Sequence, residues 1–320
     1  MARLKKYITN RGFLPEATPL RAVHNTTAST EIIGNIAAEL PKLLLTNQIR
    51  PTINKIKNLD LHLDDHSLEE QELLFAQLSF IAHAYVWGNL KPVKNLPHNI
   101  SAPWVKLSKK FKRPPVLSYA SYCLHNWYKI NETKDVSLDN VALINNFLGG
   151  IDEDWFVTIH VCIEDAASLA ISSIAKIVDD ELWNDESLLA EELQTIKKSI
   201  VKVNEIFRLM PDKCDPYIYY HRVRPYIFGW KNNPDLPEGL IYDGFFQDKP
   251  QLFRGETGAQ SSIIPSLDAL FNVRHEKDEL RDYLDEMKLY MPDNHRNFIQ
   301  IVEEESKVED AALSSSKINA

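Results

Sequence analysis

The segment from residue 151 to 179 constrains the fold more than any other part of this sequence. Its apolar residues recur on nearly every side of a helix, and His160, Glu164 and Asp165 lie in its middle. A helix that is apolar almost all round is stable when other helices surround it. Charged side chains are costly inside a lipid bilayer, so the segment is expected to be the buried helix of a globular core and not a membrane span.

Further signals along the chain also predict helices. Ser67 and Glu70 form a capping-box pattern ahead of an apolar run that continues to Val86. Residues 186–209 alternate apolar and charged residues at the spacing of a half-exposed helix, and residues 141–148 are predicted to form a helix that ends at a diglycine. Strand patterns of period two are scarce. The predicted fold class is therefore all-α.

Proline and glycine indicate how the chain is divided. A run of basic residues and prolines at 112–115 predicts a boundary between a smaller N-terminal helical domain, residues 1–112, and a larger helical domain, residues 113–320. Five of the ten glycines fall within residues 229–258, together with three prolines, which predicts a long ordered loop. Long loops inside compact domains are usually functional.

Composition narrows the classes of function. A formal net charge of -9 and the lack of a basic stripe argue against nucleic acid as a partner. The three cysteines (Cys123, Cys162 and Cys214) form no C-x-x-C pair and favour a reducing compartment. The first residues, MARLKKYITN, have no apolar run of a secretory signal. A cytoplasmic protein without membrane partners is expected.

Three features are candidates for a site, each beside a simpler interpretation. His160 lies on the buried helix and is either a functional imidazole or a core histidine satisfied by a carbonyl. Arg224 lies in an aromatic-rich stretch, where a guanidinium suits a carboxylate but also a structural ion pair or a cation–π stack. Residues 254–262, RGETGAQSS, offer backbone amides for an anion or form a simple turn. His275 and His295, in charged amphipathic sequence, are interpreted as exposed or edge histidines.

Several stretches together resemble the indoleamine 2,3-dioxygenase family, the haem enzymes that open the indole ring of tryptophan. They run in the family's order from GFLP near Gly12 to Phe298: AYVWG (84–88), LPHNISAPWVKLSKK (96–110), PPVLSYASYCLHNW (114–127), GWKNNPDLPEGLIYDGF (229–245), GAQSS (258–262) and YMPDNHRNF (290–298). The match covers nearly the whole chain, and the stretches are together very specific.

The resemblance assigns roles to particular residues. His160 matches the catalytic distal position above the haem. The residues that match the walls of the indole pocket and the group that holds the substrate carboxylate are Tyr119, Tyr122, Cys123, Phe156, Tyr219, Tyr220 and Arg224. Thr257, Gly258 and Ala259 match the turn beside the haem edge. The implied cofactor is haem b, and the implied partners are O2 and a small indole substrate.

The implied reaction converts tryptophan and O2 into N-formylkynurenine, with both oxygen atoms retained. Arg224 would hold the substrate carboxylate, and His160 would hydrogen-bond the indole N–H or the oxygen. The alternative is a non-catalytic, haem-free family member that acts as a helical scaffold or binding protein.

The sequence departs from the family at its C-terminal end. In the family, the histidine that ligates the iron follows the YMP-x-x-HRNF motif on a later helix. The residues after Phe298, IQIVEEESKVEDAALSSSKINA, contain no histidine, so no metal ligand of this kind is expected before Ala320. A missing helix would also leave apolar surface that favours self-association into an oligomer.

This departure yields a spectroscopic prediction. The 320-residue chain, purified and mixed with hemin, should show a weak or absent axial-histidine spectrum and little turnover, because no proximal imidazole controls the iron. Absorption spectra with and without dithionite and carbon monoxide measure this. A strong Soret band with efficient tryptophan turnover would contradict it.

Overall fold

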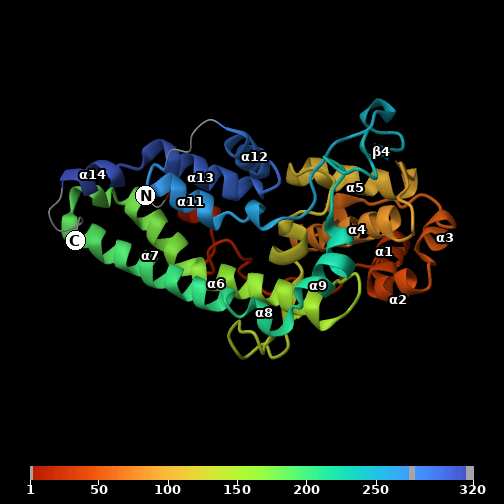
Figure 1. The fold of residues 1–320 in the computed structure, drawn as a ribbon, viewed down its shortest axis with the longest axis horizontal. Helices are drawn as coiled ribbons and strands as arrows, with labels where there is room; N and C mark the ends of the chain where they lie inside the picture. The colour runs from red at the N-terminus through yellow and green to blue at the C-terminus, as the bar shows by residue number, and fades with distance from the viewer. Residues whose placement is uncertain (1–2, 274–277, 315–320) are drawn as a thin grey trace.

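The computed structural model describes residues 3–273 and 278–314 and is built mainly of helices (Figure 1). The longer helices are α1 (Ala28–Ala38), α4 (Leu68–Trp87), α5 (His98–Phe111), α6 (Ile151–Asp179), α7 (Glu186–Phe207), α11 (Ile263–Leu270), α12 (Glu279–Lys288), α13 (Asp293–Glu305) and α14 (Val308–Ser314). The shorter ones are α2 (Leu40–Leu45), α3 (Ile49–Asn54), α8 (Met210–Lys213), α9 (Pro216–Ile218) and α10 (Arg224–Ile227). The all-α prediction is confirmed. His275 lies outside the described residues.

The strands are short, and Leu96, Trp127 and Tyr242 in them are buried in the core. Strand β1 (Asn95–Leu96) pairs in parallel with β4 (Ile241–Tyr242), and β2 (Trp127–Lys129) pairs antiparallel with β3 (Val141–Leu143). The predicted long loop is confirmed, since residues 229–257 contain β4 and one short 3₁₀ turn, Phe246–Asp248, and a second 3₁₀ turn begins at Gly258.

Helix α6 links the two ends of the molecule. Figure 1 shows α1–α5 gathered at one end, α11–α14 at the other, and α6 with α7 running between them. The bounds of α6 coincide with the predicted segment, and most of its side chains are buried; Leu169, 63% exposed, is an exception. Helix α7 is tied to it where Ser199 Oγ donates to the carbonyl of Ala166 at 2.6 Å.

The predicted helix over residues 141–148 is wrong. Val141–Leu143 forms β3, and the following residues form a turn. Asn126 explains the difference, because its side chain accepts from the amide of Asn145 at 2.8 Å and donates to the Asn145 carbonyl, also at 2.8 Å. A buried asparagine thus takes up the backbone groups that a helix would need.

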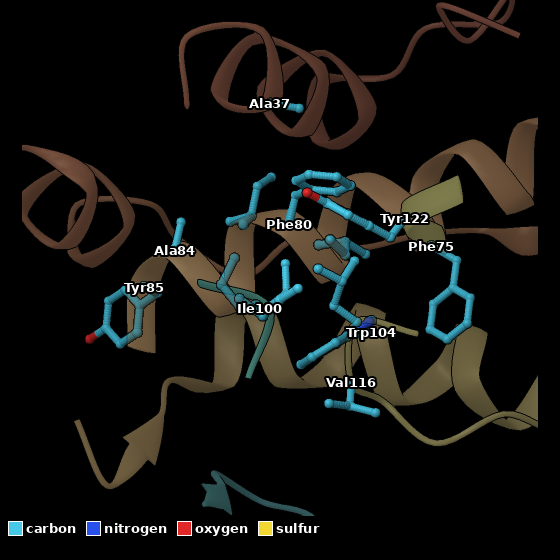
Figure 2. Close-up of a cluster of buried hydrophobic side chains, with 14 of the residues drawn as sticks. Ala37, Phe75, Phe80, Ala84, Tyr85, Ile100, Trp104, Val116 and Tyr122 are labelled. Carbon is cyan, nitrogen blue, oxygen red and sulfur yellow. The ribbon is translucent and has the colours of Figure 1, made fainter. Parts of the chain in front are cut away.

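The predicted capping box at the start of α4 is confirmed. Ser67 Oγ accepts from the amide of Glu70, whose carboxylate accepts from the amide of Ser67. Helix α4 then contributes Phe80 to a large core that also contains Trp104 of α5, Val116 and Tyr122 (Figure 2). This core holds residues from both sides of position 112, and Arg113 at the predicted boundary is buried against Glu72 of α4. The division into two domains stays a prediction.

His295 is buried, so its interpretation as an exposed or edge histidine is wrong. Its ring lies 4.3 Å from that of Phe13, and its Nδ1 lies 3.0 Å from Ser262 Oγ. The helix is amphipathic as expected, but the histidine falls on its inner face with Phe298 and Ile299. The contact joins the N-terminal GFLP stretch to α11 and α13.

No helix among the described residues is long and apolar enough to cross a membrane.

His83 of α4 fixes two of the segments that carry candidate site residues. The amide of Leu117 donates to its Nε2 at 2.9 Å, so Nδ1 bears the proton and donates to the carbonyl of Tyr226 at 2.8 Å. Both nitrogens are satisfied by backbone groups, and the imidazole is neutral. Burial lowers the pKa of His83 to about 3.

This depressed pKa predicts a loss of stability in mild acid. Below the ordinary pKa of 6.5, His83 binds a proton in the unfolded chain but not in the folded protein. The free energy of unfolding therefore falls as the pH drops. Between about pH 7 and pH 5 the loss attributable to His83 should be about 2 kcal/mol. His83→Gln can still donate and accept without titrating, so its urea-unfolding free energy should fall less over this range. Equal pH slopes in the two proteins would contradict the assignment.

Candidate functional site

One face of α6 presents Phe156, His160 and Glu164 in successive turns. Residues four apart lie above one another on a helix. The rings of Phe156 and His160 are 4.4 Å apart, and His160 Nδ1 lies 2.8 Å from the Phe156 carbonyl. A carbonyl accepts only, so Nδ1–H donates and Nε2 carries a free lone pair. Burial lowers the pKa of His160, which keeps the imidazole neutral.

Aromatic rings from two segments lie against this face. Tyr119 meets the His160 ring edge-on with centroids 5.8 Å apart, and Tyr219 stacks on Phe156 at 4.2 Å. Tyr122 lies further from Phe156, at 6.3 Å. Tyr122 and Tyr219 lie in two π-helical turns, Ala120–Leu124 and Tyr219–Val223, and Tyr119 directly precedes the first. Such turns re-aim side chains and are frequent at functional sites.

The buried carboxyl of Glu164 holds this cluster in place, and sequence reasoning missed its role. Its Oε1 accepts from the Tyr119 hydroxyl at 2.9 Å and from Ser261 Oγ at 2.7 Å. The amide of Tyr119 also donates to Gln260 Oε1 at 2.8 Å. Burial raises the pKa of Glu164 to about 7. The one signal in the sequence was its position one turn after His160.

Arg224 lies at the exposed side of the cluster. Its guanidinium carbon is 5.4 Å from the Tyr220 ring and 5.3 Å from the Phe228 ring. It forms no hydrogen bond or ion pair with any residue that the structure describes. It lines an open cleft of about 550 Å³ together with Glu256 and Thr257. Arg224 therefore makes cation–π contacts, and its guanidinium N–H groups are still available to bind a ligand.

The two other cations in this cleft share one carboxylate. Lys231 Nζ and Arg254 Nε lie 2.8 Å and 2.9 Å from the two carboxylate oxygens of Glu286. Arg224 is thus the cation in the described lining of the cleft that stays free for an incoming anion.

The remaining predicted residues divide between the buried cluster and its edge. Cys123 is buried, and burial beside Glu256 and Glu164 raises the pKa of its thiol, so it stays protonated. Tyr220 is 55% exposed and belongs to the outer side with Arg224. The predicted residues thus lie in one region of the fold. Tyr219 belongs to the aromatic cluster around Phe156, and Tyr220 lies on the exposed side with Arg224.

The turn at 257–261 borders a second cleft. Gly258–Gln260 forms a 3₁₀ turn in which Thr257 Oγ1 accepts from the amide of Ala259 at 3.4 Å. Gly258 and Ala259 line a cleft of about 520 Å³ with residues of α11 and α12. The bond from Ser261 to Glu164 places this turn against α6, one helical turn from His160.

Glu256 is a second residue that sequence reasoning missed. Burial raises the pKa of its carboxyl to about 8, and its Oε1 is inaccessible and without a hydrogen-bond partner among the described residues. An acidic residue inside the glycine-containing turn was the available signal. Among the described residues, no group of three or more His, Cys, Asp and Glu side chains could hold a metal ion.

These features define an all-α protein that combines a partly buried imidazole and aromatic rings with a cleft that contains a free guanidinium. Comparison with known proteins agrees with this class. The family model for indoleamine 2,3-dioxygenase matches residues 3–319. The chain belongs to the indoleamine 2,3-dioxygenase family, which confirms the resemblance found in its sequence.

Individual relatives are similar over most of the chain. Indoleamine 2,3-dioxygenase 1 of Rattus norvegicus is 38% identical over 84% of this chain and 66% of its own length. Indoleamine 2,3-dioxygenase 2 of Homo sapiens is 32% identical over 88% and 69%. Indoleamine 2,3-dioxygenase of Saccharomyces cerevisiae is 31% identical over 94% and 70%. The chain therefore spans about two thirds of the length of these relatives.

The Glu164 network predicts a specific pH dependence of stability. Its folded pKa of about 7 exceeds the ordinary value of 4.5, so its stabilising effect is complete in acid and is lost as the pH rises through 7. Glu164→Gln keeps the acceptor oxygen for Tyr119 and Ser261 but cannot ionise. From about pH 5 to pH 8 its unfolding free energy should gain about 2 kcal/mol relative to the unmodified protein.

Chemical denaturation at the two pH values measures this, and Glu164→Ala, which removes both hydrogen bonds, should be destabilised at each. Parallel curves for the Gln variant and the unmodified protein would show that Glu164 is not buried as described.

Proposed function

We propose that this protein binds tryptophan and, with haem b, catalyses the O2-dependent opening of its indole ring to N-formylkynurenine. The observation that carries the proposal is the union of a neutral imidazole, stacked aromatic rings and a free guanidinium in one region. Family membership supports the same reaction. No observation favours the alternative of a non-catalytic scaffold.

The aromatic rings suit an indole. Tyr119, Phe156 and Tyr219 offer ring faces and edges within a few ångströms of one another, and offset or edge-on packing of an indole against them is favourable. Tyr122 and Cys123 line the inner side, where burial excludes water. Arg224 binds the substrate carboxylate through two parallel hydrogen bonds. The substrate is thereby fixed at both ends.

The tautomer of His160 limits what it does in the reaction. Because Nδ1–H donates to the Phe156 carbonyl, Nε2 accepts a hydrogen bond and does not donate one. The indole N–H is a donor and fits this nitrogen. A role as acceptor for the indole N–H is thus favoured over donation to oxygen.

The described residues fit a haem group on two counts. His160 Nε2 has no partner among them, and Gly258 and Ala259 open onto the cleft beside α11, where no heavy atom lies within 4 Å of a Cβ built on Gly258. Thr257, Gly258, Ala259 and His160 are the residues that would hold the haem. Bound haem would supply the activation of O2. A cytoplasmic location is compatible with the three free cysteines, which are all buried.

An isotope experiment tests the reaction. The protein is mixed with hemin, a reductant, L-tryptophan, isotopically labelled O2 and added imidazole, which offers an axial nitrogen. Mass spectrometry should find N-formylkynurenine with both labelled oxygen atoms, and product formation should increase with imidazole. No product with or without imidazole, or a product with one labelled atom, would contradict the proposal.

Arg224→Ala should weaken binding of L-tryptophan by about 10- to 100-fold, the value of a lost charge-assisted contact. Titration calorimetry measures this, and Arg222→Ala, which removes an exposed arginine two residues earlier, is the matched control. Binding that is equal in both variants would show that Arg224 does not hold the carboxylate.

A further inference from the structure

Glu256 is fixed where two backbone segments cross. Gly229 and Gly255 approach so closely that a Cβ on Gly255 would overlap the Ile227 carbonyl and the Gly229 amide. The amide of Glu256 donates to the same Ile227 carbonyl at 3.1 Å. Ile227 ends α10, the helix that Arg224 begins. The position of Glu256 relative to Arg224 is therefore set by the main chain and by two glycines that no larger residue could replace.

The carboxyl of Glu256 faces the aromatic cluster without a partner. Its Oε1 is inaccessible and accepts no hydrogen bond from the described residues. The negative charge of Glu256 contributes to raising the pKa values of Tyr119, Tyr122, Cys123 and Tyr219. A buried acceptor that is left unpaired destabilises the folded protein. Such a group calls for an explanation, and a ligand that donates hydrogen bonds would supply one.

Arg224 and Glu256 line the same cleft but are not in ion-pair contact. The positive charge of Arg224 lowers the pKa of Glu256, yet burial outweighs it. Lys231 and Arg254, which also line the cleft, are held by Glu286. Arg224 and the buried Oε1 of Glu256 thus remain without a partner among the described residues beside a cleft of about 550 Å³, which is also lined by the exposed carboxylate of Asp235.

We propose that Arg224 and Glu256 form a two-point clamp for the zwitterionic head of an α-amino acid, with the carboxylate on Arg224 and the ammonium on Glu256. This rests on the proposed function and adds a specificity-determining residue to it. A ligand with both charges satisfies both groups. An indole that lacks either charge leaves one group of the clamp unpaired, which is how sites built on hydrogen bonds discriminate.

The clamp also predicts a proton release. Burial raises the pKa of the Glu256 carboxyl to about 8, although the positive charge of Arg224 lowers it, so near neutral pH the free carboxyl is mostly protonated. An incoming ammonium favours the carboxylate and displaces this proton into solvent. Indole-3-propionate, which has no ammonium, should displace none.

Titration calorimetry with L-tryptophan, tryptamine and indole-3-propionate tests the clamp, and buffers of different ionisation enthalpy report the proton count. The unmodified protein should bind L-tryptophan more tightly than either analogue. Glu256→Gln should weaken the binding of L-tryptophan by about 10-fold or more and abolish proton release. Its affinity for indole-3-propionate should stay within about 2-fold of that of the unmodified protein. Glu256→Asp, which keeps the charge, should restore part of the selectivity.

Glu238→Gln is the matched control, because it removes the same charge from an exposed position in the same loop. Circular dichroism establishes that each variant is folded. If Glu256→Gln binds L-tryptophan with the selectivity and the proton release of the unmodified protein, the clamp is overturned and the proposed function is not. Failure of the unmodified protein to bind any of the three indoles would overturn the proposed function and the clamp together.

Discussion

The site depends on a carboxyl group that the fold removes from water. Glu164 accepts hydrogen bonds from Tyr119 and Ser261, which lie 45 and 97 residues away in the chain. A single oxygen thus joins α6, the segment before the first π-helical turn and the turn ahead of α11. It reinforces the contact between the Tyr119 and His160 rings and the hydrogen bond from the Tyr119 amide to Gln260 of the turn at 257–261. Because both hydrogen bonds end on Oε1, the carboxyl can carry a proton on Oε2 and still accept both of them.

A second set of constraints positions the outer half of the site. His83, neutral and bonded to two backbone groups, fixes Leu117 and Tyr226 relative to α4. Gly229 and Gly255 let the chain cross itself and hold residue 256 beside α10. These contacts involve main chain on one side, so they are insensitive to the identity of neighbouring side chains. They bring an imidazole, aromatic rings and two opposite charges into one region.

The sequence predicted features that depend on local pattern. The apolar pattern of residues 151–179 and the capping box at Ser67 each depend on residues within a single helix, and both predictions are confirmed. Predictions failed where distant groups intervened. Residues 141–148 look helical, but Asn126, buried beside them, takes their backbone hydrogen bonds. His295 has charged neighbours in sequence, yet its own side chain faces Phe13 and Ser262.

The site was partly predictable for the same reason. His160 and Arg224 stood out because an imidazole on an apolar helix and a guanidinium among tyrosines are unusual locally. Glu164 and Glu256 did not, because a carboxylate is common in helices and turns, and only the tertiary fold shows that these two are buried. Their roles follow from contacts across the chain and not from spacing.

We propose that His160, its aromatic neighbours and Arg224 bind one molecule together. A crystal structure of the protein with L-tryptophan tests it most directly. The indole should pack against Phe156 and Tyr119 with its N–H toward His160 Nε2, while the carboxylate meets Arg224. An indole bound elsewhere, or one whose carboxylate faces solvent away from Arg224, would contradict the account.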